Sequence, residues 1–249
     1  MIAIDKLEDL AREAGAEIRR IYESHSYSVS TKADRSPVTE ADLAANAILV
    51  AGLKQFGALP YISEEEPRQT LEHSPERYWL IDPLDGTKEF VNRRKSFTVN
   101  IALIEMGVPT VAVVYDPMEE RMYSAFHGDY RENGRIISAH TPWPAGTILL
   151  SSHSHPEEAL TSFLSRNSIT EHHRVGSSIK FCLVASRRAH IYPRFHSLNA
   201  WDTAAGDGVA RAAGCHVIDW QTGLPPIYAY EQALTPAFCI SAPQTAIQR

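Results

Sequence analysis

The stretch "WLIDPLDGTKEF" (Trp79–Phe90) places two aspartates, Asp82 and Asp85, on either side of a Pro-Leu pair. Asp-Pro and Asp-Gly are ordinary turn dipeptides, so the segment taken alone is more typical of a turn. We expect Gly86 and Thr87, which follow at once, to begin a helix. Their unpaired backbone N–H groups would then lie beside the two carboxylates, and such a helix start can bind phosphate. The stretch therefore predicts either a turn or a seat for a metal ion and a phosphate.

Three further acidic segments bear on this choice: "TEAD" (Thr39–Asp42), "SEEE" (Ser63–Glu66) and "WD" (Trp201–Asp202). Each has a simpler interpretation, as a capping box, a solvated surface and a first-turn helix acid respectively. Carboxylates gathered without basic partners repel one another unless a cation lies among them. Hard oxygen ligands select Mg²⁺, Mn²⁺ or Ca²⁺, and a carboxylate that bridges two such ions about 3.5–4 Å apart is the usual arrangement for phosphoryl hydrolysis. The four segments together favour a metal-dependent phosphatase.

Composition excludes several other classes of protein. The chain has 249 residues, of which 44% are hydrophobic and 22% charged, so it can bury a sizeable core. A net charge of −6 without a run of five basic residues argues against a nucleic-acid partner. Three widely spaced cysteines without a CxxC motif indicate a reducing compartment and no zinc site.

The N-terminus lacks the marks of a signal peptide, and no apolar run reaches the length of a membrane span. We therefore expect a cytoplasmic protein with no integral membrane segment. The sequence leaves open whether the chain associates peripherally with the inner face of the cell membrane. It also leaves open whether the chain is a monomer or a homodimer.

The apolar pattern predicts an α+β fold. Helical spacing runs from Ile4 to Ile21, a second helix should start after Thr39, and a short buried strand should span residues 78–81. An antiparallel meander should follow up to residue 126, and strands then alternate with helices. The Pro- and Gly-rich segment 140–146 suggests one phosphatase domain, 1–249, with an N-terminal α+β subdomain (about 1–143) and a C-terminal α/β subdomain (about 144–249).

In this order, "SEEE", "IDPLDGTKEF" and "WDTAAG" resemble the inositol monophosphatase superfamily of Mg²⁺-dependent, lithium-sensitive phosphatases. The segments "FTVNIALI", "GSSIKFCLVA", "YPRF" and "DWQ" bring the chain closer to the CysQ-type 3'(2'),5'-bisphosphate nucleotidases. The resemblance extends from "KADRSPVTEAD" to about Pro225, nearly the whole chain. It implies a layered αβαβα sandwich of the inositol monophosphatase and fructose-1,6-bisphosphatase type.

The resemblance also implies a set of metal ligands. One Mg²⁺ would be held by Glu64, Asp82 and the carbonyl of Leu84, and a second by Asp82, Asp85 and Asp202. Two or three ions per active site are expected, with Mn²⁺ as a substitute for Mg²⁺ and Li⁺ as an inhibitor.

Catalytic roles follow from the same resemblance. Thr87, hydrogen-bonded to Asp42, would orient and deprotonate the attacking water, and Glu64 would contact water near the first ion. The N–H groups of Gly86 and Thr87 would bind the scissile phosphate.

The implied substrate is 3'-phosphoadenosine 5'-phosphate, cleaved to AMP and phosphate, with the sulfated nucleotide as a related substrate. The residues expected to contact the substrate are Gly86, Thr87, Lys88, Ser177, Ser178, Lys180, Arg194 and Asp202. A helix cap explains "GSSIK" equally well, and a surface ion pair explains Arg194 equally well. Two alternatives stay open: an inositol-monophosphate or sugar-phosphate phosphatase of the same superfamily, and a non-catalytic sensor of metal and nucleotide.

Overall fold

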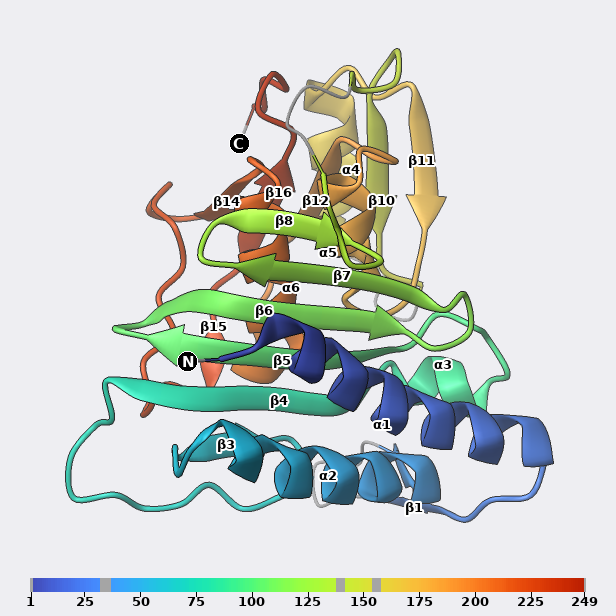
Figure 1. The fold of residues 1–249 in the computed structure, drawn as a ribbon. Helices are drawn as coiled ribbons and strands as arrows, with labels where there is room; N and C mark the ends of the chain where they lie inside the picture. The colour runs from blue at the N-terminus through green and yellow to red at the C-terminus, as the bar shows by residue number, and fades with distance from the viewer. Residues whose placement is uncertain (1, 32–36, 138–141, 154–157, 249) are drawn as a thin grey trace.

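The computed structural model describes residues 2–31, 37–137, 142–153 and 158–248, and these form five alternating layers of helix and sheet (Figure 1). Helices α1 (Ile4–Ser24) and α2 (Glu40–Leu53) cover one face of a seven-stranded sheet. Helices α5 (Ile179–Ala185) and α6 (Ala200–Ala212) lie between that sheet and a five-stranded sheet, and α4 (Glu158–Arg166) packs on the outer face of the five-stranded sheet. The predicted αβαβα sandwich is confirmed.

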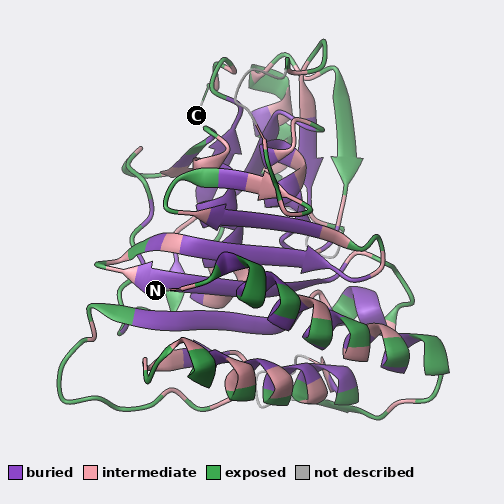
Figure 2. Ribbon diagram, viewed as in Figure 1, coloured by how far each residue is buried: buried purple, intermediate pink, exposed green. Residues whose placement is uncertain are grey.

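The seven-stranded sheet has the order β3-β4-β5-β6-β7-β8-β9, with β3 parallel to β4 and all other neighbours antiparallel. Its strands are β3 (Tyr61–Ser63), β4 (Arg77–Asp85), β5 (Thr98–Glu105), β6 (Val108–Asp116), β7 (Arg121–Phe126), β8 (Asp129–Glu132) and β9 (Arg135–Ile136). Asn133 and Gly134, both at positive φ, make the hairpin turn that their sequence predicts. The central strands are buried along most of their length (Figure 2).

The five-stranded sheet has the order β11-β10-β12-β16-β14 and is mixed, because β16 runs antiparallel to both of its neighbours. Its strands are β10 (Ile148–Ser151), β11 (Glu171–Arg174), β12 (Ile191–Arg194), β14 (His216–Asp219) and β16 (Phe238–Ser241). The structure also has two small two-stranded ribbons: β1 (Val29–Thr31) pairs with β2 (Pro37–Thr39), and β13 (Leu198–Asn199) pairs with β15 (Leu234–Thr235). The remaining elements are two short helices, η1 (Lys54–Phe56) and α3 (Thr87–Val91).

The larger sheet uses described residues up to 136, and the smaller one begins at 148. Part of the expected boundary segment, residues 138–141, lies outside the described residues. Helix α6 contributes Val209 to the core of the larger sheet and Ala210 to the core of the smaller one. The division into subdomains near residue 143 stays a prediction.

Strand β4 corrects the sequence prediction at the decisive stretch. The expected strand ended at Ile81, whereas β4 continues through Pro83 to Asp85. The register pairs Asp82 with Asn100 and Asp85 with Thr98, and it shifts between these two pairs, which marks a bulge. A bulge tolerates proline because the extra residue does not need to donate a ladder hydrogen bond. The two aspartates therefore belong to a strand end, and their interpretation as an ordinary turn is wrong.

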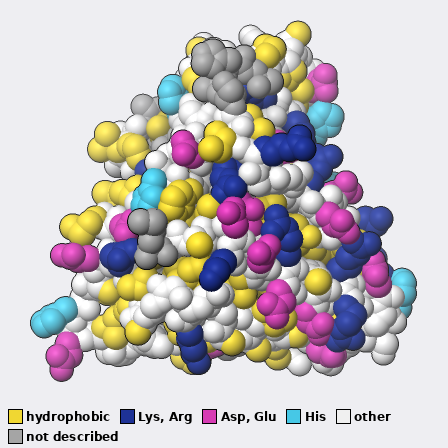
Figure 3. Space-filling model, in the orientation of Figure 1, with side chains coloured by type: hydrophobic (Ala, Val, Ile, Leu, Met, Phe, Trp, Pro, Cys, Tyr) yellow, Lys and Arg dark blue, Asp and Glu magenta, His cyan; other side chains and the backbone are white. Residues whose placement is uncertain are grey.

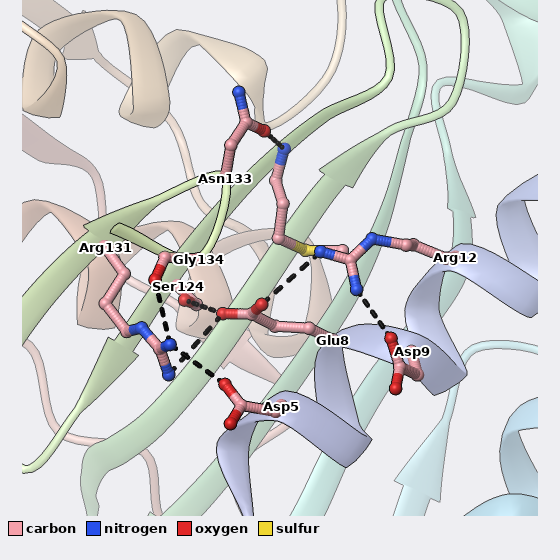
Figure 4. A network of polar contacts seen from close by, with 9 residues as sticks. Asp5, Glu8, Asp9, Arg12, Ser124, Arg131, Asn133 and Gly134 are labelled. Carbon is pink, nitrogen blue, oxygen red and sulfur yellow. Dashed lines mark hydrogen bonds and ion pairs between the residues drawn. The ribbon is translucent and has the colours of Figure 1, made fainter. Parts of the chain in front are cut away.

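Helix α1 is fixed to the sheet by a polar network with residues of β7 and β8 (Figure 4). Buried Glu8 accepts a hydrogen bond of 2.7 Å from Ser124 on β7, and Arg131 on β8 reaches Asp5 at 2.9 Å. Acidic and basic side chains are interspersed over the face that carries α1 (Figure 3). None of the described helices combines the length and the apolar character that crossing a membrane requires.

Close packing around α6 generates a first prediction. A Cβ atom on Gly206 would lie 2.4 Å from Cγ of Phe181, on the neighbouring helix α5. At an exposed position inside a helix, Gly→Ala raises the free energy of unfolding by about 1 kcal/mol. Overpacking a core lowers it by about 1–3 kcal/mol. We expect Gly206→Ala to lower the free energy of unfolding by about 1–2 kcal/mol, measured by urea denaturation. A more stable variant would contradict this packing.

Candidate active site

Three carboxylates from distant segments meet at one point. Glu64 follows β3, Asp82 lies near the end of β4, and Asp202 stands in the first turn of α6. One oxygen from each lies within 4.8 Å of the others. The structure thus brings together "SEEE", "DPLD" and "WD". Asp85 lines the adjoining cavity, where its carboxylate accepts a hydrogen bond from the backbone N–H of Ser178.

Asp82 is the most deeply buried member of this group. Its Oδ1 accepts a hydrogen bond of 3.0 Å from the N–H of Leu84, and among the described residues its Oδ2 finds no hydrogen-bond donor. A buried carboxylate oxygen normally has such a partner. A buried carboxylate oxygen without a donor, on a residue whose carboxylate lies close to two others, is consistent with a cation-binding site.

The electrostatics of the group agree with this interpretation. Burial, reinforced by the neighbouring carboxylates, raises the pKa values of Asp82 and Asp202 well above the ordinary range. Burial also raises the pKa of Asp85 to about 6, although Lys180 and the N–H of Ser178 partly oppose it. A hard divalent cation would offset this repulsion, and carboxylate and carbonyl oxygens are the ligands it selects. The residues present fit such an ion.

Asp42 links a helix cap to the site. Its Oδ2 accepts hydrogen bonds from the N–H and the hydroxyl of Thr39, at 2.7 and 2.5 Å, and so completes the capping box of α2. Its Oδ1 accepts a hydrogen bond of 2.8 Å from the hydroxyl of Thr87. Burial raises the pKa of Asp42, and these hydrogen bonds oppose the rise. Both roles expected of Asp42, as a cap and as the partner of Thr87, are met by one side chain.

Gly86 and Thr87 stand where the sequence places them, at the start of α3. Gly86 has φ +104°, and a Cβ there would lie 3.0 Å from the carbonyl oxygen of Ser96, so glycine is required. The first N–H groups of a helix have no intrahelical acceptor. They are therefore available to an anion in the cavity, which Gly86 and Thr87 both line.

Two buried basic side chains, Lys180 and Arg194, line the same cavity. The ammonium of Lys180 donates to the carbonyl of Ser177 and lies 5.0 Å from the ring centre of Tyr192. Burial lowers the pKa of Lys180 to about 8, and Asp85 opposes the shift. Lys88 lines the cavity from an exposed position. Ser177 and Ser178 also line it, and the Ser178 hydroxyl bonds with residues of β5.

Several lining residues were missed by sequence reasoning: Glu89, Ser152, Phe181, Tyr192, Leu198 and Asn199. Tyr192 could have been found, because it precedes Arg194 by two positions and shares its face of the strand. The family resemblance predicts that the "TKADRSPVT" loop (Thr31–Thr39) closes over the site. Its Pro37 lines the cavity, and its residues 32–36 lie outside the described residues.

The basic loop after α3 has a structural role at its first residue. The loop contains the basic sequence "RRK" (Arg93–Lys95). Arg93 donates to the carbonyl of Tyr22 at 2.5 Å, and its guanidinium lies 3.7 Å from the ring centre of that tyrosine. It therefore anchors the end of α1.

Residues 3–245 match the inositol monophosphatase family. The chain belongs to this family. Its similarity to the nucleotidase branch is confirmed by "3'(2'),5'-bisphosphate nucleotidase CysQ" from Shigella flexneri, which is 44% identical over 96% of this chain and 99% of that protein. The protein of the same name from Escherichia coli K12 is 43% identical over the same shares.

Solved structures of inositol monophosphatase family members agree with this membership. CysQ from Bacteroides thetaiotaomicron has a TM-score of 0.80 at 33% identity and covers 96% of this chain and 97% of its own. The suhB protein of Bartonella henselae has a TM-score of 0.77 at 26% identity, and the match covers 94% of this chain and 93% of the suhB chain. The family fold is therefore shared along almost the entire chain.

The raised carboxyl pKa values generate a prediction on metal and pH. Burial raises the pKa of Asp85 from 3.8 to about 6 in the folded protein. Without metal, the protonated Asp85 therefore adds to the stability of the fold below about pH 4, and this stabilisation is lost as the pH rises through 6. Mg²⁺ should therefore raise the melting temperature more at pH 8 than at pH 5. At about 100 times its dissociation constant the ion should add about 2.7 kcal/mol at the higher pH.

Two variants make this measurement specific. Asp85→Asn should lose most of the Mg²⁺ effect, because a neutral amide is a weaker ligand. Asp116→Asn should keep it, since Asp116 also has a pKa raised by burial to about 6 but is not among the residues that line the cavity. Equal Mg²⁺ effects at both pH values, or an equal loss in both variants, would contradict the assignment.

Proposed function

We propose that the chain hydrolyses the 3'-phosphate of 3'-phosphoadenosine 5'-phosphate, giving AMP and inorganic phosphate in a Mg²⁺-dependent reaction. The observation that carries the proposal is the composition of one cavity. Carboxylates that repel one another lie beside the start of α3, and the same cavity is lined by two buried basic side chains, Lys180 and Arg194. A metal-assisted phosphatase needs the first feature, and a substrate with a second phosphate explains the other.

The proposed ligands of two or three Mg²⁺ ions are Glu64, Asp82, the Leu84 carbonyl, Asp85 and Asp202. When bound, such ions polarise the attacking water and stabilise the leaving oxygen. We expect Mn²⁺ to substitute for Mg²⁺ and Li⁺ to inhibit, as the family resemblance implies.

Groups of the chain itself transfer the proton and bind the phosphate. Because the hydroxyl of Thr87 donates to Asp42, its oxygen is free to accept a proton from the attacking water. As that proton reaches Oγ1 of Thr87, the original hydroxyl proton moves to Oδ1 of Asp42. Glu64 would contact water beside the cluster of carboxylates. The N–H groups of Gly86 and Thr87 hold oxygens of the scissile phosphate.

The second phosphate is assigned to Lys180 and Arg194, and the remainder of the nucleotide to the surfaces of Lys88, Ser177 and Ser178. With a pKa lowered to about 8, Lys180 is still mainly protonated at neutral pH. Burial strengthens the interaction of both cations with a phosphate, because water screens it less.

The alternative is an inositol-monophosphate or sugar-phosphate phosphatase. An inositol monophosphate would use the same carboxylates, but it has no second phosphate for Lys180 and Arg194 to bind. A non-catalytic sensor is disfavoured because Thr87, Asp42 and all four acids are present. We further propose that the protein acts in the cytoplasm, as a monomer or a homodimer.

The direct test is a comparison of substrates. Phosphate release would be measured with Mg²⁺ from 3'-phosphoadenosine 5'-phosphate, inositol 1-phosphate and fructose 1,6-bisphosphate, each with and without Li⁺. We expect the highest kcat/KM for the nucleotide, and inhibition by Li⁺. A preference for inositol 1-phosphate would replace the nucleotidase proposal with the alternative, and no turnover of any substrate would remove the enzyme proposal.

Thr87 provides a sharper test of the mechanism. Thr87→Ala should lower kcat by roughly 10²–10⁴ with little change in KM, because the water loses its proton acceptor. Thr87→Ser keeps the hydroxyl and should retain most of the activity, which makes it the matched control. Steady-state kinetics of the two variants decide the point: an unchanged kcat in Thr87→Ala would reduce Thr87 to a structural residue.

A further inference from the structure

Strand β5 carries two buried polar side chains beside the acidic cluster. Thr98 and Asn100 share one face of β5 with Ala102 and Ile104, which pack in the core formed with α5 and α6. Thr98 is 0% exposed and Asn100 is 1% exposed. Burying a hydroxyl and an amide in an apolar layer is unfavourable unless they are hydrogen-bonded. Both residues lie in register with the proposed ligands, Thr98 opposite Asp85 and Asn100 opposite Asp82.

Both side chains bind the same residue of the neighbouring layer. The hydroxyl of Ser178 lies 2.8 Å from that of Thr98 and donates a bond of 2.8 Å to the amide oxygen of Asn100. Ser178 is 3% exposed, and its backbone N–H donates to Oδ2 of Asp85. A continuous path of hydrogen bonds thus runs from β5 through Ser178 to a carboxylate of the cluster.

Asn100 has a second feature that points to the same cluster. Among the described residues, its buried Nδ2 finds no hydrogen-bond acceptor, and Oδ2 of Asp82 finds no donor. The two residues are direct partners across β4 and β5. A donor and an acceptor that are both buried and unsatisfied, on paired residues at the site, indicate a polar function and not simple core packing.

We propose that Thr98, Asn100 and Ser178 are positioning residues that fix the carboxylates of Asp85 and Asp82 in the orientation that binds the cation. The inference rests on the proposed function, because it takes the two aspartates as Mg²⁺ ligands. Ser178 holds Asp85 through its N–H, β5 holds Ser178, and the amide of Asn100 is the polar neighbour of Asp82. Groups that orient metal ligands typically change metal affinity or activity about 10–100-fold when removed.

The test uses Mg²⁺ itself as the probe. The Mg²⁺ concentration that gives half of the maximal increase in melting temperature would be measured for the wild type, Ser178→Ala and Thr98→Val. Thr98→Val keeps the shape of the side chain and removes only the hydroxyl, so it remains informative if Ser178→Ala folds poorly. Thr98→Ser keeps the hydroxyl and serves as the conservative rescue.

Ser124→Ala is the matched structural control. Ser124 is also a buried hydroxyl of the same sheet, and it bonds Glu8 in the network that holds α1, outside the cavity (Figure 4). We expect about a tenfold higher Mg²⁺ requirement in Ser178→Ala and in Thr98→Val, and a wild-type requirement in Thr98→Ser. Ser124→Ala should lower the metal-free melting temperature and leave the Mg²⁺ requirement unchanged.

The outcomes separate this inference from the proposed function. A wild type that responds normally to Mg²⁺, with unchanged requirements in Ser178→Ala and Thr98→Val, overturns the positioning role alone. A wild type without any Mg²⁺ response overturns the proposed metal site and the positioning role together. If the Mg²⁺ requirement rose as much in Ser124→Ala as in Thr98→Val, the inference would also be overturned, because the rise would then reflect a general loss of stability.

Discussion

Electrostatic repulsion among clustered carboxylates is the interaction that governs the site. Asp82 and Asp202 are brought together with Glu64 by elements from three separate parts of the chain, and Asp85 stands close by. Burial and mutual repulsion raise the pKa values of these aspartates. A flexible chain would relieve such repulsion by moving the groups apart. Here the packed layers on either side of α6 hold the acids in place, so that the binding of a cation is the favourable way to relieve it.

The supporting residues serve both the fold and the site. Asp42 completes the capping box of α2 and accepts a hydrogen bond from the hydroxyl of Thr87, so one carboxylate serves the helix start and the proposed route of the water's proton. Gly86 permits the backbone conformation that α3 needs at its start, and it also lines the cavity in which we propose that a phosphate binds. Because these roles coincide, a change at either residue is expected to alter the geometry of the cavity as well as the local structure.

Much of this arrangement follows from local sequence, and the remainder depends on tertiary contacts. The spacing from Ile4 to Ile21 and the Asn133-Gly134 dipeptide act over a few residues, so α1 and the hairpin were predictable. The path of β4 through Pro83 was not, because it needs the bulge that β5 imposes. Strand β11 has four exposed residues and no apolar alternation, so no pattern indicates it. Likewise the contacts of Arg93 with Tyr22, and of Ser178 with β5, join residues far apart in the chain.

We infer that these carboxylates form a single metal centre. The anomalous scattering of a crystal of the wild-type protein grown with Mn²⁺ would locate the bound ions. We expect anomalous peaks inside the cavity, in contact with carboxylate oxygens of Glu64, Asp82, Asp85 and Asp202. A map without a peak in this cavity, or with Mn²⁺ held there by other residues, would contradict it.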